Sequence, residues 1–94
     1  MAHHKVKTDA PVFKDMEDLS KDFEIRYNDR NYQEGDTITS CETVHTGLEM
    51  SKGAPLIFTG KEIDMDVAYI LHGPIYGLLP GWIIMSVFIT DIRV

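Results

Sequence analysis

Three residues between positions 21 and 26 combine two cations with a carboxylate: Lys21, Glu24 and Arg26. An arginine presents a planar fork of donors that fits a phosphate or a base carbonyl, and a lysine adds a compact positive charge. A glutamate beside them can accept hydrogen bonds from an exocyclic amine. The alternative interpretation is a same-face ion pair that only bridges strands, which contributes about 0 to 1 kcal/mol on a surface.

The segment 23–28 alternates apolar and polar residues, which is typical of a β-strand with two different faces. Three apolar side chains share one face, and we expect this face to pack: Phe23, Ile25 and Tyr27. The charged face is then free to bind. Residues 28–29 break the alternation and 34–36 supply a turn, so the charged group should lie at the rim of the sheet, where ligands often bind.

These residues resemble a known family. Lys21, Glu24 and Arg26 reproduce the K-x-x-E-x-R core of ASCH domains. Residues 23–36 resemble the F-E-I-R-x-N-D-R and G-D signature of an uncharacterised ASCH-like branch frequent in phages and bacteria, and residues 69–82 are similar to its C-terminal half. Leu19 stands where the family usually has glycine.

The resemblance implies a PUA-like barrel whose cleft beside the K-x-x-E-x-R strand binds RNA or modified nucleosides. It implies a pocket made by Lys21, Glu24 and Arg26, with a rim shaped by the residues that follow: Asn28, Asp29 and Arg30. Recognition of single-stranded RNA also requires aromatic rings that stack on bases. Three tyrosines are candidates for this role: Tyr27, Tyr32 and Tyr76.

Our first hypothesis is therefore a non-catalytic domain that binds RNA or a modified nucleotide, with no catalytic residue and no cofactor assigned. The second is a small amidohydrolase acting on an acylated cytidine, because some small ASCH proteins with that activity resemble this chain in the lysine and arginine. Those enzymes use a threonine where Glu24 stands, so Lys21 and Glu24 would act here, with Glu24 as a base toward water. The third is a phage-encoded factor that contacts a host protein through its acidic surface and the loop around Tyr76.

Length and charge narrow these hypotheses. The 94 residues form one domain, 1–94, with a modest core, and the net charge of −6 excludes coating of nucleic acid through general phosphate attraction. Any nucleic-acid contact must be local, and six of the nine basic residues lie in the first 30 positions: Lys5, Lys7, Lys14, Lys21, Arg26 and Arg30. The single cysteine and the charged start of the chain indicate a cytoplasmic protein. The oligomeric state stays open.

Other reactive side chains carry no predicted site. Cys41 lies in a β-branched segment without a base nearby in the sequence, so we expect an inert, buried or half-buried thiol. Asp64 and Asp66 share a strand face without a third oxygen ligand, which favours a solvated face over a Mg²⁺ site. The histidines lack metal-ligand spacing, so no metal is assigned: His3, His4, His45 and His72.

Residues 5–8, 37–44, 63–71 and 82–89 are expected to form strands in addition to 23–28. An amphipathic helix of about ten residues should begin after Asp9 and bury one apolar stripe. The stripe contains Val12, Phe13, Met16 and Leu19. These elements predict an α+β fold, a small PUA-like (ASCH) mixed β-barrel of five to six strands with one N-terminal helix.

Two segments fit more than one structure on sequence alone, residues 67–89 and residues 46–60. Residues 67–89 lack a formal charge and are long enough to span a membrane, but glycines and prolines interrupt them, so we expect two buried strands and no membrane span. Their connecting loop, 72–81, should fold back onto the barrel or cover a pocket. Residues 46–60 fit either a hairpin or a mobile excursion.

Overall fold

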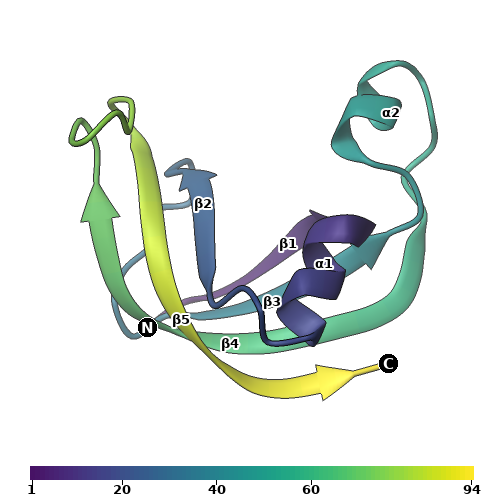
Figure 1. Cartoon of the computed structure of the whole chain (residues 1–94), viewed down its shortest axis with the longest axis horizontal. Helices are drawn as coiled ribbons and strands as arrows, with labels where there is room; N and C mark the ends of the chain where they lie inside the picture. Colours follow the sequence, from purple (N-terminus) through teal and green to yellow (C-terminus); the bar gives the residue numbers. More distant parts are fainter.

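The computed structural model describes residues 1–94 and contains one five-stranded sheet and two short helices. In chain order the elements are β1 (His3–Asp9), α1 (Ala10–Glu17), β2 (Phe23–Tyr27), β3 (Thr37–Thr43), α2 (Gly47–Ser51), β4 (Phe58–His72) and β5 (Trp82–Arg93). The strand order is β1-β3-β4-β5-β2, and only β1 and β3 pair in parallel. The sheet curls into a half-barrel, so its two edge strands lie within the curve (Figure 1).

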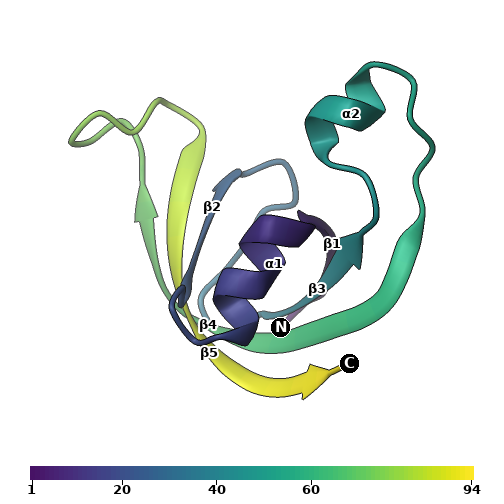
Figure 2. The ribbon, with the colours of Figure 1, turned by 45° about the vertical axis from the view of Figure 1, so that its right-hand side comes forward.

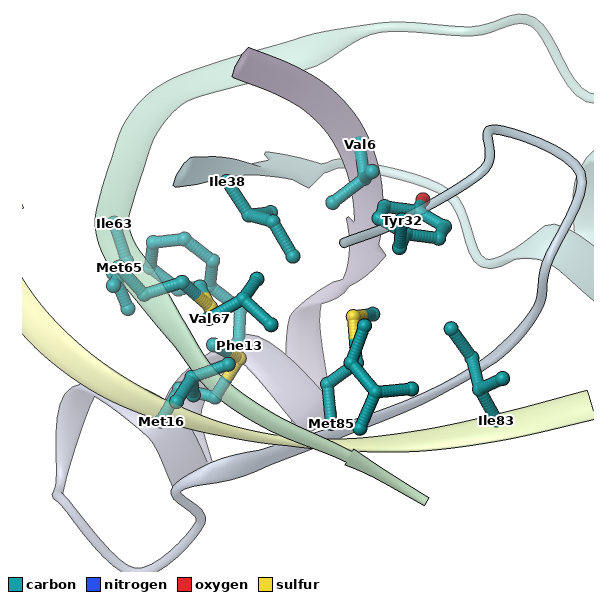
Figure 3. Close-up of a cluster of buried hydrophobic side chains, with 12 residues drawn as sticks. Val6, Phe13, Met16, Tyr32, Ile38, Ile63, Met65, Val67, Ile83 and Met85 are labelled. Atoms are coloured by element: carbon teal, nitrogen blue, oxygen red, sulfur yellow. The ribbon is translucent and has the colours of Figure 1, made fainter. Parts of the chain in front are cut away.

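Helix α1 lies inside the curve of the sheet (Figures 1 and 2). Phe13 and Met16, three residues apart on one helical face, are fully buried there. They pack with side chains from the inner faces of the strands and from the loop before β3 (Figure 3): Val6, Tyr32, Ile38, Ile63, Met65, Val67, Ile70, Ile83, Met85 and Val87. The helix thus completes the core that the open sheet cannot close alone.

The predicted helical stripe is only half correct. Phe13 and Met16 are core residues, but Val12 is exposed and α1 ends before Leu19. Leu19 has a φ of +62° and is 68% exposed. Its amide donates to the Met16 carbonyl, and the Ser20 amide donates to that of Asp15, which is the Schellman arrangement of a helix C-terminus.

All predicted strands are present, and the uncharged segment 67–89 forms the end of β4, a loop and the start of β5. No helix has the length and apolarity needed to cross a membrane. The predicted alternation of β4 fails after Val67, because the register with β5 shifts between Val67 and Tyr69. Beyond this irregularity Ile70 is buried and Tyr69 is exposed, the reverse of what simple alternation predicts.

The two faces of β2 are also the reverse of the prediction. Glu24 points into the half-barrel and is 3% exposed, whereas the three apolar side chains lie on the outer face: Phe23, Ile25 and Tyr27. Their partners on β5 include Ile84 and Trp82, so the outer apolar surface continues across both strands. Alternation identifies the residues that share a face, but the placement of the strand decides which face is inside.

The two uncertain segments form compact local structures. In 46–60, α2 begins with a capping box formed by Thr46 and Glu49, and the segment connects the antiparallel strands β3 and β4 without a separate hairpin of its own. The loop 73–81 closes on itself through Ile75 and Leu78 and extends beyond the ends of β4 and β5 (Figures 1 and 2). The expectation that it folds back onto the barrel is wrong, since Tyr76 at its tip is 95% exposed.

Candidate functional site

The half-barrel is open between its edge strands β1 and β2, and we call this opening the seam. One hydrogen bond crosses it, from Arg26 Nη2 to the Lys7 carbonyl at 3.2 Å. Two hollows lie along the seam. The first, the glutamate hollow, has a volume of about 340 Å³ and is lined by Lys7, Thr8, Asp9, Val12, Lys21, Glu24, Ile25 and Arg26.

The second, the aromatic hollow, has a volume of about 400 Å³. It is lined by Val6, Lys7, Ile25, Arg26, Tyr27, Asp29, Arg30, Tyr32 and Trp82. Lys7, Ile25 and Arg26 line both hollows, so these residues form a common boundary. Both volumes are in the usual range of small-molecule sites, about 300 to 1,000 Å³.

Glu24 is the centre of the polar group that the sequence predicted. Its Oε2 lies 3.4 Å from Arg26 Nε and 3.9 Å from Lys21 Nζ. Its Oε1 accepts a hydrogen bond from Ser40 Oγ on β3 at 3.2 Å. A buried carboxylate requires such partners, and together they fix its position. Ser40 was not predicted, because nothing in the sequence of β3 marks its inward side.

Lys21 lies in the connection before β2 and is held in place by the first residue of that strand. Its ammonium donates to the Phe23 carbonyl and lies 4.9 Å from the centroid of the Phe23 ring. Both Lys21 and Arg26 keep only a small exposed fraction of their side chains. The cations are therefore positioned before any ligand arrives, which lowers the entropic cost of binding.

Two buried polar atoms at the seam have no hydrogen-bond partner: Thr8 Oγ1 and Arg26 Nε. The approach of Arg26 Nε to Glu24 is an ion pair without hydrogen-bond geometry. Thr8 is 5% exposed and lines the glutamate hollow, yet its hydroxyl is unsatisfied. A buried polar group left unpaired costs about 1 to 3 kcal/mol, so these two atoms indicate a place where a ligand can supply the partner.

The predicted rim residues differ in what they do. Asn28 fixes the loop that follows β2. Its side-chain Oδ1 accepts a hydrogen bond from the Tyr32 backbone amide at 2.8 Å, and its backbone amide donates to the Gly81 carbonyl at 2.9 Å. Asp29 and Arg30 are exposed, line the aromatic hollow and form no ion pair. Only these two are placed to contact a ligand directly.

Of the candidate tyrosines, only Tyr27 combines a place at the seam with an accessible ring. It is 55% exposed and meets Trp82 edge to face, with ring centroids 6.0 Å apart. Tyr32 is 1% exposed, packs against His4, and has its pKa raised by burial. Tyr76 lines neither hollow. Trp82 was missed as a site residue because it adjoins Tyr27 only through the pairing of β5 with β2.

Asp36, from the G-D part of the signature, fastens the N-terminus to the loop before β3. Its buried carboxylate accepts hydrogen bonds from the Ala2 amide, His4 Nε2 and the Gln33 amide at 2.9, 2.9 and 3.0 Å. The hydrogen bonds from Ala2 and His4 lower the pKa of Asp36 to about 2. His4 is thus an integral part of the fold.

The remaining reactive side chains are engaged in contacts elsewhere on the sheet. Cys41 is buried as predicted, and burial together with the charge of Glu62 raises the pKa of its thiol. Asp64 accepts hydrogen bonds from Arg93 and from Thr39. The hydrogen bond from Arg93 is the main cause that lowers the pKa of Asp64.

Fold and site together define a small α+β half-barrel domain with a polar seam between its edge strands. The chain belongs to the DUF3850 family, a domain of unknown function, whose family model matches residues 3–87. This range includes every residue that lines the seam. No curated protein matches the chain.

Proposed function

We propose that the seam binds RNA or a modified nucleotide without catalysis, and that the half-barrel is a PUA-like barrel of the ASCH type acting in the cytoplasm. One observation carries the proposal. A buried carboxylate, Glu24, lies between Lys21 and Arg26 at the wall of a hollow of about 340 Å³. Two buried polar atoms without hydrogen-bond partners, Thr8 Oγ1 and Arg26 Nε, support it.

The chemistry of the glutamate hollow suits the edge of a nucleobase. Glu24 can accept a hydrogen bond from an exocyclic amine, and Arg26 and Lys21 can donate to a carbonyl or a phosphate. The Thr8 hydroxyl can donate or accept, while Val12 and Ile25 provide apolar contact for a ring face. Recognition of this kind is local, which is compatible with a chain of net charge −6.

A binding titration tests the proposal. The probes are the common ribonucleosides, an acylated cytidine and short single-stranded RNA of mixed sequence. Arg26→Lys keeps the charge and removes the forked donor, so we expect the affinity to fall about tenfold, the equivalent of one charge-assisted hydrogen bond.

Lys14→Ala is the matched control, because Lys14 is an exposed cation on α1 outside the seam. It should leave affinity unchanged. Thermal unfolding followed by circular dichroism verifies that both variants fold. If the wild-type protein binds none of these probes, the proposal is wrong.

A second candidate function is hydrolysis of an acylated cytidine, and the unpartnered Thr8 hydroxyl in the hollow of Lys21 and Glu24 favours it. Water would bond to the acyl carbon, the C–N bond would break, and the amine would leave with a proton relayed by Glu24. Against this, Glu24 already accepts contacts from three groups. Release of cytidine that disappears in Glu24→Gln would establish the enzyme, and an unchanged substrate would exclude it.

A further inference from the structure

Building on the proposed function, we propose that the seam binds a single strand across two consecutive nucleotides. One base occupies the glutamate hollow, the linking phosphate lies over Lys7 and Arg26, and the next base lies against Tyr27 and Trp82. The ligand class is then an oligonucleotide, and a free nucleoside fills only one half of the site.

The shape of the site fits a ligand of this length. The two hollows have similar volumes, about 340 and about 400 Å³, and they share Lys7, Ile25 and Arg26. The two hollows are therefore adjacent, and the hydrogen bond from Arg26 to the Lys7 carbonyl lies at their boundary. A ligand that extends past this boundary contacts both β1 and β2.

Positive charge is distributed unevenly along the site. Lys7 and Arg26 at the boundary are both cations, and no carboxylate lines both hollows. Glu24 is shared between Arg26 and Lys21, at 3.4 and 3.9 Å. Four cations and three carboxylates line the two hollows together, and Lys7 is the boundary cation without a carboxylate partner. The excess of positive charge is thus at the boundary, where the linking phosphate would lie.

The side chain of Lys7 is available to an anion, because its ammonium has no ion pair or hydrogen bond within the protein and only its carbonyl is engaged, by Arg26. Lys5, two residues earlier on the same strand, lies 3.6 Å from Glu62. The two lysines therefore form a matched pair. One is available for an anion and the other is already neutralised.

The two hollows differ in the groups that they offer to a base. The glutamate hollow offers hydrogen-bonding groups that distinguish base edges, whereas the aromatic hollow offers the rings of Tyr27 and Trp82. Stacking on aromatic rings is tolerant of base identity. We therefore expect the site to select its first base and to accept different bases at the second position.

The test compares ribonucleosides with dinucleoside monophosphates in titrations followed by amide chemical shifts. The best dinucleotide should bind about tenfold more tightly than its parent nucleoside. Its log affinity should fall with log salt concentration with a slope of about −0.7, as expected for one phosphate, while nucleoside affinity should not change. A parallel titration with the deoxyribose forms of the same dinucleotides shows whether the 2′-hydroxyl contributes to affinity.

Lys7→Ala should remove most of the dinucleotide advantage, because it lowers dinucleotide affinity far more than nucleoside affinity, whereas Lys5→Ala should alter neither. Tyr27→Leu should likewise weaken dinucleotide binding more than nucleoside binding. Equal affinities for nucleoside and dinucleotide would overturn this inference while the proposed function stands. A dinucleotide that binds more tightly but is insensitive to Lys7→Ala would overturn it as well. Failure of every probe to bind would refute the proposed function itself.

Discussion

At the scale of single residues, the side chain that most directly separates a binding role from a structural one is Thr8. Its buried hydroxyl has no partner, so it weakens the free protein and can be satisfied by a ligand. Thr8→Val keeps the shape and removes this hydroxyl. We expect the free energy of unfolding to stay constant or to rise by up to about 1 kcal/mol, and ligand affinity to fall.

Thr43 provides the control, because it is equally buried and its hydroxyl donates to the His45 carbonyl at 2.7 Å. Thr43→Val should lower the free energy of unfolding by about 1 kcal/mol and leave binding intact. Urea denaturation measures both variants. Equal destabilisation by the two substitutions would show that Thr8 is an ordinary structural threonine.

Asp36 gives the fold a defined pH dependence. Its pKa falls from an ordinary value of 3.8 to about 2 in the folded protein, chiefly because of the hydrogen bond from the Ala2 amide and then that from His4. The carboxylate therefore stabilises the fold above pH 3.8, and this contribution is lost as the pH falls toward 2.

Asp36→Asn should lower the free energy of unfolding at neutral pH by about 2 kcal/mol, since buried hydrogen bonds to a charged group are lost. The difference in free energy of unfolding between the wild-type protein and Asp36→Asn should become smaller as the pH falls from about 4 to about 2, as measured by urea titrations. Asp66→Asn, which removes an exposed carboxylate, should produce little change at any pH. A difference in free energy of unfolding between wild type and Asp36→Asn that does not change with pH would contradict the stabilising role of the Asp36 carboxylate.

At the scale of elements, the C-terminus of α1 carries local strain. Leu19 has a φ of +62°, in the left-handed region of the backbone map. This conformation is unfavourable for a residue with a Cβ atom and is tolerated by glycine. Because Leu19 is largely exposed, Leu19→Gly loses little packing. We expect it to raise the free energy of unfolding by about 1 kcal/mol.

Leu48 is an equally exposed leucine inside α2, without a positive φ. Leu48→Gly should therefore lower the free energy of unfolding by about 1 kcal/mol, opposite in sign to Leu19→Gly. Thermal and urea unfolding would measure both. Destabilisation by Leu19→Gly would show that the leucine side chain contributes more than its backbone strain costs.

Elements also show what the sequence can predict. Strands were predictable from alternation, and the cluster of Lys21, Glu24 and Arg26 was predictable because its members are close in the chain. Which face of β2 lies inside the half-barrel was not predictable, because the pairing of β2 with β5 and the curvature of the whole sheet decide it. Thr8 and Ser40 reach the site from β1 and β3, and local sequence carries no signal for such contacts.

At the scale of the whole molecule, the curled sheet explains why the site exists. An open sheet has two edges with unpaired backbone groups, and here both edges face the seam, where charged side chains from β1 and β2 gather. Arg26 makes the hydrogen bond that joins them. The same curvature concentrates cations locally in a chain whose net charge is −6.

Amide chemical-shift mapping of the isotope-labelled protein, titrated with ribonucleosides and short single-stranded RNA, tests the central claim most directly. Binding at the seam predicts shifts in residues 6–9 and 21–26, extending to 27–30 and Trp82 with RNA. Shifts confined to residues 84–93 of β5 or to the loop 73–81, or no shifts with any probe, would contradict it.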